Sequence, residues 1–233
     1  MAVSADAGSS TRRREPWFRA AQAVLLPPLD LWFNWRYEGT EQIPAEGPML
    51  VACNHISYFD AFAIARMLIP RGRRPRFLAK IELFKNPFLR VVLKGARQIP
   101  VVRGAGSPAA LDAAVGALRS GEAVVVFPEG TTTHDPDFRQ GPSKTGIARL
   151  SFATGVPVTP MAIWGSHRIW TRQGVSSMAF GRPVWVKVGS PMTFPGHAGS
   201  EDQAVSRIVT DEIMATIAEM TGDLRARYPE RWQ

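Results

Sequence analysis

Short apolar runs alternate with longer amphipathic segments along most of the chain. Continuous apolar residues predict buried strands at 49–53, 77–79, 98–102, 123–127, 158–164 and 184–188. Apolar positions at helical spacing predict helices at 58–68, 87–94, 108–120, 145–154 and 204–227. Strands that alternate with helices are typical of an α/β fold. We therefore expect a single α/β domain over residues 37–233, with a mixed sheet flanked by helices.

The first 36 residues break this pattern. Residues 1–11 are small and polar, which predicts a disordered tail. The arginine run 12–14 precedes an apolar stretch that includes Trp17 and Leu25, and this mixture favours a helix lying at a bilayer surface. No apolar run reaches the roughly 20 residues needed to span a bilayer. We expect residues 1–36 to form a tail and an interfacial helical segment; a helix packed on the protein's own core is the alternative.

Composition agrees with a single domain in a reducing compartment. The chain has 233 residues, of which 45% are hydrophobic, enough to bury a substantial core. The only cysteine, Cys53, excludes an intramolecular disulfide, and its place in an apolar run indicates a packing residue rather than a nucleophile. The N-terminal residues lack the charged-then-apolar order of a secretory signal. We expect the chain to stay on the cytoplasmic side.

The charge of the chain calls for an anionic partner. The formal net charge is +8 and the sequence pI is about 10.4. Such a balance suits nucleic acid, an anionic membrane surface or a phosphorylated substrate. The sequence has no aromatic pattern of an RNA-recognition module and no zinc-finger spacing, so nucleic acid is the weakest of the three.

The most informative polar residues follow the first predicted strand. His55 comes directly after an apolar run, and Asp60 lies five residues later. Because residues five apart in a helix point about 140° away from each other, the two side chains meet only if His55 lies in a turn and Asp60 begins the next helix. A neutral imidazole would then accept a proton while the carboxylate fixes its tautomer. The pair indicates general-base catalysis on a substrate hydroxyl, with a structural or metal-binding role as the alternative.

Other polar groups also follow predicted strands. Arg103 comes after residue 102, and its permanently charged fork is suited to phosphate. Glu129, Gly130 and Thr131 come after residue 127: the glycine lets backbone amides approach an oxyanion, and the threonine can donate a hydrogen bond. Turns at strand ends are where open α/β folds assemble ligand sites. We expect these residues to converge on one site.

Four ordered blocks carry a family resemblance. They are residues 51–60 (VACNHISYFD), 99–103 (IPVVR), 127–131 (FPEGT) and 156–160 (VPVTP). In this order they resemble the glycerophospholipid acyltransferase family, of the 1-acylglycerol-3-phosphate acyltransferase type. The resemblance runs from about residue 37 to about residue 188.

This resemblance implies direct acyl transfer from acyl-CoA or acyl carrier protein to the hydroxyl of a lysophospholipid, most simply 1-acylglycerol-3-phosphate to give phosphatidic acid. It implies that His55 is the base, that Asp60 holds it, that Arg103 binds the acceptor phosphate, and that Glu129 anchors its loop or orients the acceptor. We expect no cofactor and no bound metal. We expect peripheral attachment to an anionic membrane surface, at the cytoplasmic face of the cell membrane.

One departure from the family pattern leaves the acceptor open. Many relatives have an arginine after the residue that matches Thr131, but here Thr132 and Thr133 follow. Either Lys144 supplies the missing charge, or the acceptor is a different lysolipid or a glycolipid. Two other functions also fit the residues: an acyl-thioester hydrolase in which His55 activates water, and a lipid-binding module without turnover.

Overall fold

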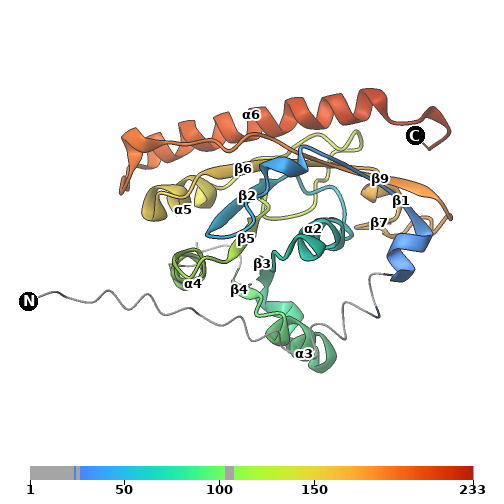
Figure 1. Ribbon diagram of the computed structural model, residues 1–233, viewed down its shortest axis with the longest axis horizontal. Helices are drawn as coiled ribbons and strands as arrows, with labels where there is room; N and C mark the ends of the chain where they lie inside the picture. Colours follow the sequence, from blue (N-terminus) through green and yellow to red (C-terminus); the bar gives the residue numbers. More distant parts are fainter. Residues whose placement is uncertain (1–23, 25–26, 103–107, 233) are drawn as a thin grey trace, which may run out of the picture.

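The computed structural model describes residues 24, 27–102 and 108–232. Its central feature is a seven-stranded sheet with the strand order β1-β9-β6-β2-β5-β3-β4 (Figure 1). The strands are β1 Phe33–Glu38, β2 Met49–Cys53, β3 Pro75–Lys80, β4 Ile99–Val101, β5 Ala123–Val126, β6 Val158–Trp164 and β9 Arg182–Val188. Neighbouring strands run parallel, except that β6 and β9 are antiparallel. The sheet is therefore mixed, as predicted.

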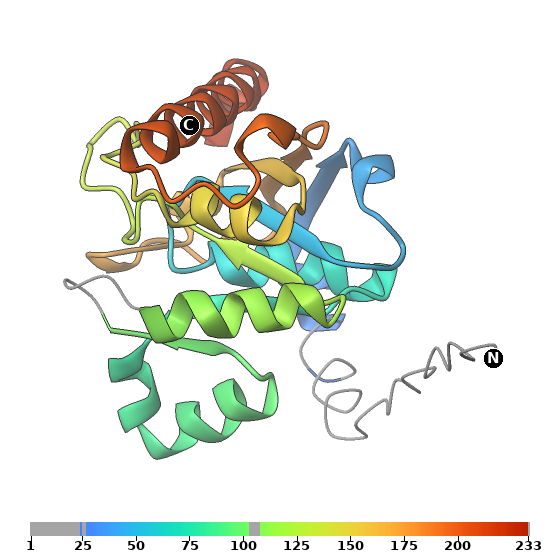
Figure 2. The same ribbon diagram turned by 90° about the vertical axis from the view of Figure 1, so that its left-hand side faces the viewer.

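Helices cover both faces of this sheet (Figure 1). Helix α2 (Asp60–Leu68) packs on one face, and α4 (Pro108–Arg119) and α5 (Gly146–Thr154) pack on the other. Helix α6 (Gln203–Arg227) contributes to both apolar clusters. Helix α3 (Pro87–Gly95) projects from the body of the molecule at the end opposite α6, as Figures 1 and 2 show.

Short elements connect these layers. Strands β7 (Trp170–Thr171) and β8 (Gly174–Val175) form a separate antiparallel hairpin. The 3-10 helices are η1 Thr40–Gln42, η2 Ile69–Arg71, η3 Ile81–Lys85, η4 Ser166–Arg168, η5 Pro195–His197 and η6 Glu230–Trp232. Of these, η4 and the β7-β8 hairpin lie directly after β6 and reach the residues that follow β2.

The central strands are apolar on both sides because both faces of the sheet are covered. In β2, Met49, Val51 and Cys53 face one core cluster, whereas Leu50 and Ala52 face the other. Helix α2 meets the first cluster through residues at helical spacing, namely Ala63, Ile64, Met67 and Leu68. The continuous apolar run that predicted a strand at 49–53 is thus the mark of a strand buried between two layers.

Most predicted elements are present with shifts of a few residues at their ends. β2 and β6 have the predicted bounds, and α3 and α6 each extend one residue beyond prediction. The helix predicted at 58–68 begins at Asp60, because Tyr58 and Phe59 form a turn before it. The β7-β8 hairpin was not predicted, because its two-residue strands are too short to show a periodic pattern.

The N-terminal boundary was placed too late in the sequence. Strand β1 starts at Phe33 and pairs in parallel with β9, so residues 33–36 belong to the sheet and not to the interfacial segment. Residues 27–32 are helical. The predicted tail and the arginine run 12–14 lie outside the described residues. No helix among the residues that the structure describes combines the length and the apolar character needed to cross a bilayer.

Candidate active site

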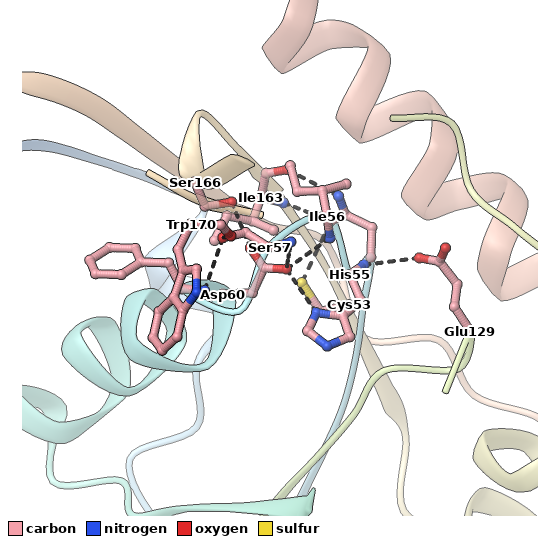
Figure 3. Close-up of polar contacts among 11 residues, drawn as sticks. Cys53, His55, Ile56, Ser57, Asp60, Glu129, Ile163, Ser166 and Trp170 are labelled. Carbon is pink, nitrogen blue, oxygen red and sulfur yellow. Dashed lines mark hydrogen bonds and ion pairs between the residues drawn. The ribbon is translucent and has the colours of Figure 1, made fainter. Parts of the chain in front are cut away.

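His55 and Asp60 meet at the carboxyl end of β2, as their spacing predicted (Figure 3). His55 lies in the loop after the strand, and Asp60 is the first residue of α2. The imidazole Nδ1 is 2.9 Å from the Asp60 Oδ2 atom. A carboxylate only accepts hydrogen bonds, so Nδ1 carries the proton and Nε2 keeps its lone pair. The pair therefore presents a base.

The Asp60 carboxylate is fully buried and held on every side. Oδ2 also accepts hydrogen bonds from the backbone N–H groups of Ile56 and Ser57, each at 2.8 Å. Oδ1 accepts one from the Ser166 hydroxyl at 2.6 Å. Four donors offset the cost of burying the carboxylate and fix its position.

Ser57 does not have the simple capping role that a serine before a helix suggests. Its hydroxyl accepts a hydrogen bond from the Phe59 N–H at 2.9 Å and donates to the Trp170 carbonyl at 2.5 Å. The carboxylate of Asp60 accepts the N–H groups that precede the helix. Ser57 thus ties the turn to the β7-β8 hairpin and is engaged away from any nucleophilic role.

The His55 ring lies between the protein and a cavity. One face stacks on Phe127, with ring centroids 4.1 Å apart and planes 16° from parallel. The side chain is 16% exposed, and the residue lines the cavity. No described residue forms a hydrogen bond with Nε2. The basic nitrogen is therefore available to a substrate.

Glu129 anchors the loop after β5 and forms no hydrogen bond with the His55 ring nitrogens. Its Oε1 accepts a hydrogen bond from the His55 backbone N–H at 2.9 Å, and its Oε2 accepts one from the Gly141 N–H at 3.0 Å. Burial raises the pKa of Glu129 above its ordinary value of 4.5, although the two N–H groups oppose this shift. The carboxylate joins the β2 and β5 loops to residue 141.

Gly130 and Lys144 form one corner of the cavity. Gly130 has φ +68°, a backbone conformation that favours glycine, and an added Cβ would lie 3.2 Å from the Lys144 Cε atom, so the lysine side chain packs closely on this glycine. The Lys144 N–H donates to the Pro128 carbonyl at 2.8 Å, which holds the lysine beside this turn. Thr131 instead accepts a hydrogen bond from Arg172 at 3.2 Å and is not among the cavity-lining residues.

The cavity has a volume of about 400 Å³ and an apolar and a cationic side. Its cationic side chains are Lys80, Lys144 and Arg149. The first turn of α5 also lines the cavity, at Gly146. That turn has no side-chain cap, so its N–H groups remain available to an anion. The apolar lining comes from Leu78, Val101, Val102, Pro108, Ala110, Leu111, Val126, Phe127 and Leu150. This arrangement suits a ligand with both an anionic group and an apolar chain.

The structure brings together only some of the predicted site residues. His55, Gly130 and Lys144 line the cavity, Asp60 and Glu129 lie behind it, and Arg103 lies outside the described residues. The roles assigned to these residues stay predictions.

Three residues of the site were missed by sequence reasoning. Lys80 ends β3, just after the predicted strand 77–79, and Arg149 lies inside the predicted helix 145–154, so neither position indicated a binding role. Ser166 contacts Asp60 although the two are 106 residues apart. No sequence signal links them.

Thiol and metal chemistry find no support in the described residues. Cys53 is fully buried in β2, and burial raises the pKa of its thiol well above the ordinary value. The described residues contain no group of three or more His, Cys, Asp or Glu side chains placed to hold a metal ion.

A histidine held by a buried aspartate at the end of a strand in an α/β sheet is an arrangement suited to activating a substrate hydroxyl. A sequence model described as acyltransferase matches residues 34–164, more than half of the chain. The chain belongs to the acyltransferase family.

Individual relatives share between a quarter and a third of their aligned residues with this chain. The chain is 27% identical over 146 residues to a 1-acyl-sn-glycerol-3-phosphate acyltransferase of Bacillus subtilis, covering 62% of this chain and 70% of that protein. It is 28% identical over 135 residues to a chloroplastic enzyme of the same name from Brassica napus, covering 57% of this chain and 38% of the relative. This chain thus spans well under half the length of the plant protein.

The fold has a solved counterpart. The crystal structure of the 1-acyl-sn-glycerophosphate acyltransferase PlsC from Thermotoga maritima superposes with a TM-score of 0.66. The match covers 91% of this chain and 85% of that chain at 24% sequence identity. At this identity the likeness establishes the shared fold.

Proposed function

We propose that this protein is a 1-acylglycerol-3-phosphate O-acyltransferase that moves a fatty acyl group from an acyl thioester to the free hydroxyl of its acceptor, giving phosphatidic acid. One observation carries the proposal: the imidazole held by Asp60 presents Nε2 at a cavity lined by cations and apolar side chains. Membership of the acyltransferase family and relatives named for this reaction support it.

The reaction needs no protein nucleophile. His55 Nε2 accepts the acceptor hydroxyl proton as the oxygen attacks the thioester carbonyl carbon, and a C–O bond forms. Collapse of the tetrahedral intermediate breaks the C–S bond, and the imidazolium returns its proton to the departing thiolate. Asp60 stabilises the imidazolium throughout and keeps Nδ1 protonated. The thioester supplies the activated carbonyl, so the proposal includes no cofactor.

Charge in the cavity selects the acceptor. Lys144 and Arg149 form no ion pair with any other described residue, so both are available to a phosphate monoester. We assign to Lys144 the positive charge that many relatives supply as an arginine after the threonine matching Thr131. The apolar side of the cavity then accepts the acyl chain of the acceptor or the donor.

The proposal includes the surroundings of the enzyme. Its acceptor resides in a bilayer, and the formal charge of +8 favours an anionic membrane surface over a neutral one. We therefore place the protein peripherally at the cytoplasmic face of the cell membrane, with acyl-CoA or acyl carrier protein as the donor.

The test compares acceptors with a common acyl thioester and identifies products by mass spectrometry. We expect phosphatidic acid from 1-acylglycerol-3-phosphate and much slower acylation of 1-acylglycerol, which lacks the phosphate. Lys144→Gln should raise the KM for the phosphorylated acceptor by about tenfold, the effect of one lost charge-assisted contact. Arg119→Gln, at the exposed end of α4, is the matched control. Release of free fatty acid without any acylated product would overturn the proposal in favour of a hydrolase.

A further inference from the structure

Helix α3 exposes large apolar side chains that do not pack in the protein core. Phe88 is 75% exposed and Val91 is 72% exposed, and Val92 is also exposed. The helix has no buried residue, and its main packing partner is η3. Leu89 and Leu93, four residues apart, are its partly buried side. The opposite side of α3 therefore presents an apolar row to its surroundings.

Cations flank this apolar row. Arg90 and Lys94 lie one turn apart on α3, and Lys85 ends η3 just before the helix. None of these three forms an ion pair with another described residue. The segment from 83 to 97 contains no aspartate or glutamate. An exposed helix with an apolar row, flanking cations and no acidic residue matches the physical requirements for lying in the headgroup region of an anionic bilayer.

The position of α3 connects this surface to the site. The η3 and α3 crossover leaves β3 after Lys80 and returns to β4, which ends at Val101. Lys80, Val101 and Val102 all line the cavity. Because β3 and β4 are parallel, their carboxyl ends lie together, and the crossover that carries α3 leaves the sheet at this end, after the cavity-lining Lys80. Figure 2 shows α3 at the lower edge of the molecule, below α4. A bilayer in contact with α3 would therefore be close to the place where a lipid substrate enters.

We infer that Phe88, Val91, Arg90 and Lys94, together called the α3 surface, dock the protein on an anionic lipid bilayer. The inference rests on the proposed function for its purpose, since it explains how a soluble site reaches a lipid acceptor. Phe88 and Val91 enter the apolar boundary of the bilayer, and Arg90 and Lys94 contact lipid phosphates. The occupant of this surface is a membrane.

A second copy of the chain fits the same surface poorly. A symmetric pairing through α3 would bring Arg90 and Lys94 of two copies together without a carboxylate between them. The exposed apolar row also belongs to a single short helix of nine residues. A specific protein interface is expected to bury roughly 1,000 Å², which calls for a larger surface than one such row. Charge and area both favour the bilayer.

Vesicle sedimentation of the full chain tests the inference. The probes are vesicles of phosphatidylcholine alone and of phosphatidylcholine with phosphatidylglycerol. The double variant Phe88→Glu, Val91→Glu should reduce binding to the anionic vesicles by at least about tenfold, because acidic side chains replace the inserting ones. Ile208→Glu is the matched control and should bind like the unmodified protein, because it changes a similarly exposed apolar residue on α6, the helix at the end of the molecule opposite α3.

Two further readouts complete the test. Acylation of an acceptor in vesicles should fall with the double variant, while acylation of the same acceptor dispersed in detergent should not. Vesicle binding is measured without turnover, so its result tests the α3 surface even if the acceptor proposed above is wrong. Anionic-vesicle binding unchanged in the double variant would overturn the inference. The inference would also be overturned if light scattering showed that the unmodified protein is a dimer and that the double variant loses the dimer but still binds vesicles. That result would show that the α3 surface binds a second copy of the chain.

Discussion

At the residue scale, Asp60 determines how the base is presented. Its carboxylate is fully buried and accepts four hydrogen bonds, and only one of them comes from His55. Ser166 binds the oxygen that His55 does not use. We regard Ser166 as a positioning residue, because it acts on the base through the aspartate.

Replacing Ser166 with alanine should lower kcat and leave the acceptor KM unchanged. A hydrogen bond to a buried charge contributes about 1.5 to 3 kcal/mol, so a loss of roughly tenfold or more is expected. Ser120→Ala removes an exposed serine hydroxyl just after the last residue of α4 and serves as the control. Steady-state kinetics separate the two parameters. An unchanged kcat in Ser166→Ala, or a rise in KM alone, would contradict a positioning role.

At the element scale, the chain between β5 and α5 depends on a few fixed points. Glu129 accepts two backbone N–H groups, from His55 and Gly141, and the Lys144 N–H donates to the Pro128 carbonyl. The Arg207 side chain of α6 donates to Ser143. These contacts hold the segment that carries the cavity-lining Gly130 and Lys144.

Glu129→Gln should loosen this connection. A carboxamide has one oxygen, so only one of the two N–H groups keeps its acceptor. We expect kcat/KM to fall by about tenfold and amide exchange to speed up across residues 130–142. Glu219→Gln on the exposed side of α6 is the control. Exchange rates equal to those of the unmodified protein would show that the carboxylate does not hold the loop.

The strands differ in how well the sequence predicts their ends. The strands at 49–53 and 158–164 were predicted to the residue because continuous apolar runs mark strands covered on both faces. Strand β1 was missed because FNWRYE alternates aromatic and polar residues, as an interfacial segment also does. Edge strands are partly exposed, so their composition is ambiguous. The ends of β4, the other edge strand, shifted for the same reason, and the last four residues of its neighbour β3 are only half-buried.

The site was predictable where its residues are neighbours in sequence. His55 and Asp60 are five residues apart, and the strand-turn-helix geometry followed from that spacing alone. Ser166 and Arg149 reach the site through the order of strands in the sheet, where β6 lies next to β2. Such contacts depend on how the whole chain folds. No local pattern encodes them.

At the scale of the whole molecule, a buried histidine makes stability depend on pH. Burial, with Arg168, Arg182 and Arg225 nearby, lowers the pKa of His167 to about 3. The unfolded chain binds this proton near the ordinary value of 6.5, so the unfolded state carries more protons between these two values. The contribution of His167 to stability is therefore present above 6.5 and is lost as the pH falls toward 3.

His167→Phe should reduce the acid sensitivity of folding. Phenylalanine keeps the ring contacts with Phe138 and Trp164, and a neighbouring cavity of about 150 Å³ can accept its extra volume. Between pH 7.5 and 5, the free energy of unfolding of the unmodified protein should fall by about 2 kcal/mol more than that of the variant. Denaturant titrations at both pH values measure this. Equal slopes against pH would mean that His167 is not held neutral.

One substitution tests most directly whether His55 is the base for acyl transfer. General-base catalysis contributes about 10²- to 10⁴-fold, so His55→Ala should lower acyl transfer to 1-acylglycerol-3-phosphate by at least about 100-fold. Its circular dichroism and melting temperature should stay close to those of the unmodified protein, and His197→Ala, which changes a histidine outside the cavity lining, should retain activity. A folded His55→Ala protein with near-normal transfer would contradict the mechanism.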